Sequence, residues 1–83
     1  MGRSRQPRPK HLARKLKDIR LKLGFSQFQM YEALANEQKT LYPGHITLFE
    51  NDQRIPSLLV LLQYARLARV SMDILVDDAI ELP

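Results

Sequence analysis

The chain contains no cysteine and no tryptophan, and its 83 residues include only three glycines. Without cysteine, neither a disulfide framework nor a thiolate metal site can form. The sequence also lacks a phosphate-cradling glycine loop and paired carboxylates in an evident cleft. The aspartates lack EF-hand spacing and are explained by helix capping and solvation. We therefore expect no enzyme, no cofactor, no metal site and no small-molecule substrate.

Long apolar runs are missing as well. The longest run, Leu58 to Leu62, is far too short to span a bilayer. The basic start Met-Gly-Arg-Ser-Arg is not followed by an apolar stretch, so no secretory signal is predicted. These two absences favour a cytoplasmic protein that is not attached to a membrane. The apolar fraction of 45% suffices for the core of one small domain.

Charge is distributed unevenly around a net value of +4. Residues 1–22 carry nine Lys/Arg against one Asp, residues 23–70 carry four of each sign, and residues 71–83 carry four acids and no base. A basic segment on a neutral domain suits a polyanion such as DNA or RNA. A solvated tail that merely aids solubility remains an open alternative.

Three parts are expected along the chain. Residues 1–9 hold two prolines and the arginines Arg3, Arg5 and Arg8, which predicts a flexible basic arm. Residues 10–79 are expected to form the folded domain, and residues 80–83 a C-terminal tail.

The first predicted helix starts near Lys10 and ends near Leu23. Its apolar residues recur at helical spacing on one face, namely Leu12, Leu16, Ile19 and Leu23. The opposite, polar face is assigned Arg14, Lys15, Asp18 and Lys22. Gly24 follows the last apolar residue and fits a left-handed helix cap.

Two further helices follow. Ser26 and Gln29 have the spacing of a capping box, and the helix they open extends to about Ala35. Its buried stripe is predicted to contain Phe28 or Met30, together with Tyr31 and Leu34. Residues 36–42 are polar and non-periodic, which predicts a loop. Pro43 suits the first turn of a third helix, which runs to Glu50 and buries Ile46 and Phe49.

The last two helices are separated from the third by a turn at residues 51–53, where Asn51 or Asp52 can adopt positive φ. Ser57 is the predicted N-cap of a fourth helix that ends near Arg69. Its predicted core stripe consists of Leu58, Leu61, Leu62 and Ala65. Ser71 is expected to cap a fifth helix over residues 72–78. The predicted fold class is therefore all-α, with five short helices.

The second and third helices pair as a helix-turn-helix. In that motif the first helix lies across the phosphate backbone and the second directs its N-terminal residues into the major groove. The order and spacing of the motif residues resemble the phage-repressor (Xre-like) helix-turn-helix family over Leu16 to Leu75, which implies a lambda-repressor-like domain. These residues are Ile19-Arg20, Gly24 to Gln27, Ala33-Leu34, Ile46, Phe49 to Asn51, Arg54, Pro56-Ser57, Leu61-Leu62, Ala65 and Val70 to Leu75.

The resemblance implies a role for each matching position. Gln27 would bond a phosphate, and Arg20 and Glu50 would form a buried ion pair. Backbone contacts on the far strand would come from Asn51, Gln53 and Arg54. The base-reading positions would be Pro43, Gly44, His45, Thr47 and Leu48.

Two departures from the family pattern change these expectations. Ser26 to Ile46 spans twenty residues, about five more than the ordinary motif, and the extra residues fall within Asn36–Leu41, where Lys39 could reach a phosphate. Pro43 and Gly44 have no polar side chain with which to pair a base. Recognition is therefore expected to depend more on phosphates and DNA shape, with the basic arm on phosphates or in the minor groove.

A second surface is predicted at Leu59 and Val60, two apolar residues off the core stripe of the fourth helix. Adjacent exposed apolar side chains suggest association, and a two-fold homodimer would match a palindromic site. A fold-back of the basic arm or of residues 79–83 over them is the alternative. The functional hypothesis is a dimeric, repressor-like regulator that binds double-stranded DNA. The alternative function is a protein-interaction or antitoxin-like module on the same scaffold.

Overall fold

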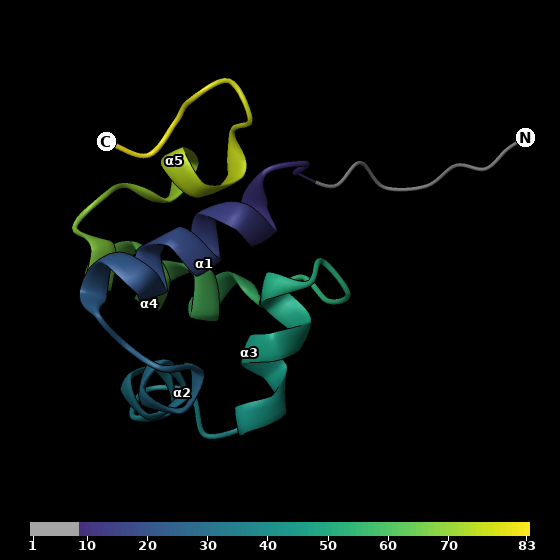
Figure 1. Ribbon diagram of the computed structural model, residues 1–83, viewed down its shortest axis with the longest axis vertical. Helices are drawn as coiled ribbons and strands as arrows, with labels where there is room; N and C mark the ends of the chain where they lie inside the picture. The colour runs from purple at the N-terminus through teal and green to yellow at the C-terminus, as the bar shows by residue number, and fades with distance from the viewer. Residues whose placement is uncertain (1–8) are drawn as a thin grey trace, which may run out of the picture.

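The computed structural model describes residues 9–83, and these form five α-helices and no strand. The helices are α1 (Leu12–Leu23), α2 (Gln27–Ala35), α3 (Pro43–Glu50), α4 (Leu58–Ala68) and α5 (Met72–Val76). The all-helical class is thus confirmed. Helix α1 occupies the centre, where it contacts α3, α4 and α5, while α2 packs against α3 and α4 (Figure 1). Arg3, Arg5 and Arg8 of the predicted arm lie outside the described residues.

Helix ends form where the local chemistry predicts them. Gly24 closes α1 with a φ of 76°, a value that costs glycine no steric strain. The Ser26 hydroxyl accepts from the Gln29 N–H at 3.1 Å while the Gln29 side chain accepts from the Ser26 N–H at 2.8 Å. Ser57 accepts from the Val60 N–H at 3.3 Å, and Asp52 adopts a φ of 59°.

The end of the chain differs from its prediction. Ser71 is the N-cap residue of α5, as predicted, but its hydroxyl donates to the Asp73 carboxylate and makes no cap bond to the backbone. Helix α5 ends at Val76, two residues before the predicted limit, because Asp77 is extended. The residues after Val76 bond to α1 instead of continuing the helix.

The core lies between all five helices. Of the predicted alternatives on α2, Met30 is buried and Phe28 is 56% exposed. On α1 and α3 the predicted core residues Leu12, Leu16, Ile19, Ile46 and Phe49 are buried, whereas Leu23 of α1 and Tyr31 of α2 are only partly buried. The buried apolar side chains are Leu12, Leu16, Ile19, Met30, Leu34, Leu41, Ile46, Phe49, Val60, Leu61, Tyr64, Ala65 and Leu75.

Helix α4 is rotated relative to its predicted orientation. Its buried residues are Val60, Leu61, Tyr64 and Ala65, whereas Leu58 is 70% exposed. Val60 is 5% exposed, so its assignment to an exposed dimer surface is wrong. The five consecutive apolar residues that open this helix have no internal periodicity, so the run itself does not indicate which of them face the core. Leu59 remains at the surface with 56% exposure.

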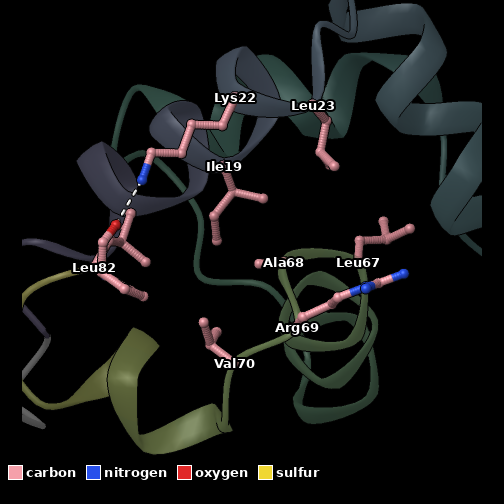
Figure 2. A pocket seen from close by; sticks show the side chains of 9 residues that line it. Ile19, Lys22, Leu23, Leu67, Ala68, Arg69, Val70 and Leu82 are labelled. Carbon is pink, nitrogen blue, oxygen red and sulfur yellow. Dashed lines mark hydrogen bonds between the residues drawn. The ribbon is translucent and has the colours of Figure 1, made fainter.

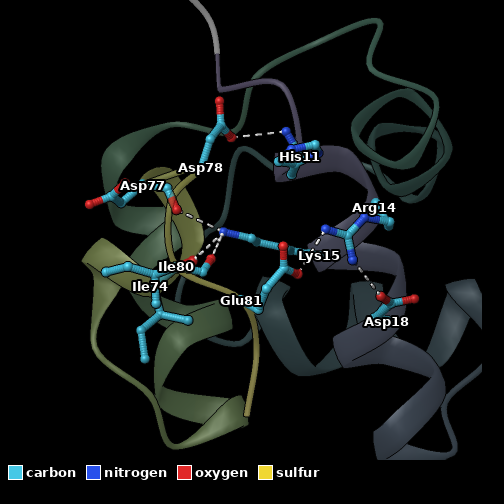
Figure 3. A network of polar contacts seen from close by, with 9 residues as sticks. All are labelled: His11, Arg14, Lys15, Asp18, Ile74, Asp77, Asp78, Ile80 and Glu81. Atoms are coloured by element: carbon cyan, nitrogen blue, oxygen red, sulfur yellow. Dashed lines mark hydrogen bonds and ion pairs between the residues drawn. The ribbon is translucent and has the colours of Figure 1, made fainter.

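Lys15 is fully buried, although the amphipathic pattern placed it on the polar face of the first helix. Its Nζ donates to three backbone carbonyl oxygens, those of Ile74 at 2.7 Å, Asp77 at 3.0 Å and Ile80 at 2.6 Å (Figure 3). A buried ammonium needs such partners because desolvation otherwise makes its charge very costly. The segment that follows α5 therefore covers a face of α1 that the local pattern assigns to solvent.

The same C-terminal segment makes further bonds along α1. The Asp78 carboxylate accepts from the N–H groups of Lys10 and His11 at 2.8 and 3.0 Å, next to the free donors that begin a helix. Glu81 pairs with Arg14 at 3.1 Å, and the Lys22 Nζ donates to the Pro83 carbonyl at 2.7 Å. These contacts secure the segment from one end of α1 to the other.

An apolar groove of about 260 Å³ lies between α1 and α4, and Leu82 lines it together with Leu23 and Val70 (Figure 2). The C-terminal segment thus reaches the opposite end of α1 from Asp78. No helix among residues 9–83 has both the length and the apolar character needed to cross a membrane.

Replacing Lys15 should destabilise the fold. Lys15→Met leaves three carbonyl oxygens without their donor, and the expected loss in free energy of unfolding is about 2–3 kcal/mol. Urea denaturation measures it, with Lys17→Met on the exposed side of α1 as the matched control. Equal stability of the two variants would show that the buried ammonium contributes nothing.

Asp78 should make stability sensitive to acid. Backbone hydrogen bonds from Lys10 and His11 lower the pKa of the Asp78 carboxyl below its ordinary value of 3.8. A depressed folded-state pKa gives stability that is present above the unfolded value and is lost as pH falls through the folded pKa. As the pH is lowered from about 4, the unfolding temperature of Asp78→Asn should therefore fall less than that of the parent. Asp18→Asn removes one partner of the exposed ion pair with Arg14. This control should keep the same dependence of unfolding temperature on pH as the parent.

Candidate nucleic-acid interface

An ion pair joins α1 to the end of α3. The Arg20 Nε and Nη2 atoms donate to the two Glu50 carboxylate oxygens at 2.7 and 3.0 Å. The side chains of Arg20 and Glu50 are 12% and 3% exposed, so the predicted buried pair is confirmed. Arg20 Nη1 also donates to the Phe25 carbonyl at 2.9 Å. The hydrogen bonds to Glu50 raise the pKa of Arg20.

Gln27, at the start of α2, extends this pair toward the surface. Its Nε2 donates to Glu50 Oε1 at 3.2 Å, and its Oε1 accepts from the Thr47 hydroxyl at 2.9 Å. We call the chain Arg20–Glu50–Gln27–Thr47 the polar relay. It links α1, α2 and α3, and it runs from a nearly buried carboxylate to an exposed hydroxyl.

Sequence reasoning missed the outer half of the relay. Gln27 and Thr47 are twenty residues apart, so no local pattern joins them. One signal was present in the sequence, because Thr47 precedes Glu50 by three residues and therefore lies on the same side of α3. Any partner that reaches Glu50 from α2 also comes close to Thr47.

The outer face of α3 carries four of the predicted contact residues. Gly44, Thr47, Leu48 and Asn51 recur at helical spacing, with Leu48 half-buried and the other three exposed. Pro43 is also exposed, in the first turn of α3. A Cβ built on Gly44 would meet nothing within 4 Å. The leading end of α3 is therefore uncovered by the described part of the chain.

His45 lies on the flank of α3 and is half-buried. Its Nδ1 accepts from the Tyr42 N–H at 3.1 Å, so in the neutral ring the proton is on Nε2. The ring is 5.5 Å from that of Tyr42 and stacks at 6.0 Å on Phe49. His45 thus caps the N-terminus of α3, a role that the expectation of a base reader did not include.

The segments on either side of α3 bring basic and polar side chains to the surface. Lys39 and Arg54 are exposed, as are Asn51 and Gln53 of the turn. Leu41 is 5% exposed and anchors the predicted loop to the core. Beside His45, a shallow hollow of about 340 Å³ connects the two segments, and it is lined by Thr40, Leu41, Tyr42, His45, Arg54, Ser57 and Val60.

Tyr64 is a fully buried residue on α4. Its hydroxyl has no hydrogen-bond partner among the described residues. Burial, followed by the charge of Glu50, raises the pKa of Tyr64 above its ordinary value. The phenol therefore stays neutral beside the relay and adds no charge to it.

No protein-family model, no curated protein and no solved structure matches this chain. Within residues 9–83, no three His, Asp or Glu side chains gather as a metal-ligating group.

Breaking the relay at Glu50 should be costly. Glu50→Ala leaves the Arg20 guanidinium without its carboxylate in a largely buried place, and the expected destabilisation is about 3 kcal/mol. Glu81→Ala removes an exposed pair with Arg14 and should cost less than about 1 kcal/mol. Chemical denaturation of both variants provides the comparison, and similar losses would contradict a structural role for the buried pair.

Proposed function

We propose that the chain is a sequence-preferring regulator of transcription that binds double-stranded DNA, of the phage-repressor (Xre-like) helix-turn-helix type that its motifs resemble. Helices α2 and α3 would form the helix-turn-helix, and the outer face of α3 would enter the major groove. The observation that carries the proposal is the uncovered leading end of α3, where Pro43 and Gly44 are exposed.

Phosphate contacts would surround this face. Gln27 has two amide N–H donors, and only one of them is used by Glu50, so the second can donate to a phosphate oxygen. Lys39 and Arg54 add positive charge on either side of α3. Asn51 and Gln53 follow α3 and would contact the backbone of the far strand. Glu50 adds little repulsion because Arg20 neutralises it.

Base reading would be limited to a few groups. Leu48 can contact a thymine methyl, and Pro43 and Gly44 allow the helix to approach closely without offering a hydrogen bond. His45 is committed at Nδ1 to its cap and would donate only through Nε2. Recognition would therefore combine a few contacts in the groove with phosphate binding and DNA shape.

A homodimer would use the exposed apolar residues at the start of α4. Ile55, Leu58 and Leu59 are 42%, 70% and 56% exposed. This group replaces the pair Leu59 and Val60 as the proposed dimer surface. Two copies related by a two-fold axis would present two α3 helices to a palindromic site. The protein would act in the cytoplasm without catalytic activity or a cofactor.

A second candidate function is a protein-interaction or antitoxin-like module. The same exposed apolar residues favour it, since contiguous apolar surface marks interaction sites. The absence of polar side chains at Pro43 and Gly44 points in the same direction. In this reading the surface at Leu58 and Leu59 is the working site, and α3 does not touch nucleic acid.

Position 44 offers a test that spares the fold. Gly44→Glu projects a carboxylate into open space, where the helix N-terminus tolerates negative charge, but it would repel DNA phosphates. We expect a mobility-shift affinity for mixed duplex DNA at least about tenfold lower than that of the isosteric control Gly44→Gln. The difference should shrink as salt is added.

The parent protein supplies the second arm of this experiment. If about five phosphates are neutralised, log K should fall with log salt at a slope near −4.5. Loss of residues 1–9 should reduce that slope if the arm binds phosphates. Absence of any retardation at low salt would favour the interaction module. Equal affinities of the Gly44→Glu and Gly44→Gln variants would show that this part of α3 does not contact DNA.

A further inference from the structure

The relay determines which way the Gln27 amide faces. Both carboxylate oxygens of Glu50 accept hydrogen bonds from Arg20, and a carboxylate has no proton to donate. The group of Gln27 that lies 3.2 Å from Glu50 Oε1 must therefore be the NH2 donor. The opposite orientation would place two oxygen acceptors against each other and is excluded on electrostatic grounds.

The orientation of the Gln27 amide then determines the direction of the Thr47 hydrogen bond. With its NH2 toward Glu50, Gln27 presents Oε1 to Thr47 at 2.9 Å, and a carbonyl oxygen only accepts. Thr47 must donate its single proton to that oxygen. The hydroxyl then has only lone pairs to offer any other partner. The nearly buried Glu50 carboxylate thus determines the hydrogen-bonding character of an exposed side chain.

Thr47 stands where a ligand of α3 would meet it. It is exposed on the outer face, one turn after Gly44 and one turn before Asn51. Gly44 has no side chain, and no atom of residues 9–83 lies within 4 Å of a Cβ built on it. A flat partner such as a base-pair edge can therefore come close to the Thr47 oxygen.

We infer that Thr47 reads an exocyclic amine in the major groove, either adenine N6 or cytosine N4, as an obligate hydrogen-bond acceptor. This inference rests on the proposed function and narrows it to a position in the recognised sequence. In the major groove only these two amines donate, whereas guanine N7 and O6, adenine N7 and thymine O4 accept. Phosphate oxygens are also acceptors, so Thr47 does not bind the backbone while the relay is intact.

The test begins with duplexes selected from a random library by the parent protein. In the selected duplex, each adenine or cytosine is replaced in turn by the analogue without the amine, purine for adenine and pyrimidinone for cytosine. Affinities are measured for the parent, Thr47→Val, Thr47→Ser and the control Thr40→Val, which removes an exposed hydroxyl outside α3.

At one position per half-site, removal of the amine should weaken binding of the parent by about fivefold. The Thr47→Val variant should lose a similar factor with the unmodified duplex and nothing further with the analogue, because the bond is already absent. Thr47→Ser should behave like the parent, since it keeps the hydroxyl, and Thr40→Val should leave the pattern unchanged.

The outcomes separate the two levels of the hypothesis. If the parent enriches no duplex and retards none, the proposed function fails and this inference fails with it. If the parent binds selected duplexes but every amine replacement acts equally on the parent and on Thr47→Val, the regulator assignment stands and the role of Thr47 is overturned. Circular dichroism of each variant checks that the fold is kept.

Discussion

The nearly buried carboxylate of Glu50 is the constraint on which the arrangement of α1, α2 and α3 depends. A charge removed from water must be paired and hydrogen-bonded, and α3 cannot supply the partners itself. Arg20 reaches the carboxylate from α1 and Gln27 reaches it from α2. One charge therefore fixes three helices relative to one another. The pairing thus acts together with the burial of Ile46 and Phe49 in holding α3 in place.

Helix α1 carries a second buried charged side chain, Lys15, which is also hydrogen-bonded. Its Nζ donates to three backbone carbonyls of the segment from Ile74 to Ile80. Arg20, five residues later, turns toward α3 instead. Arg20 thus connects α1 to α3, and Lys15 connects α1 to the C-terminal segment. This explains how a chain of 83 residues, which has little apolar surface to bury, still gives α1 defined contacts along its length.

Features that depend on neighbouring residues could be predicted from the sequence. The caps at Gly24, Ser26 and Ser57 arise within a few residues, and so does the positive φ of Asp52. The Arg20–Glu50 pair came from the family resemblance and not from local pattern. The predictions that failed concern features that depend on contacts between distant segments of the chain. The apolar run that opens α4 has no internal period, the cover over Lys15 comes from about sixty residues away, and the Gln27–Thr47 bond spans two helices.

The open space around Gly44 affects which substitutions the domain can tolerate. A side chain at this position would meet no other part of the described chain, so packing places no demand on the residue found there. Most substitutions at position 44 should leave the helix in place or strengthen it, because glycine is a weak helix former. Stability therefore places little constraint on the residue at this site. Natural variation or a designed library can alter the surface of α3 at this position without compensating changes in the core.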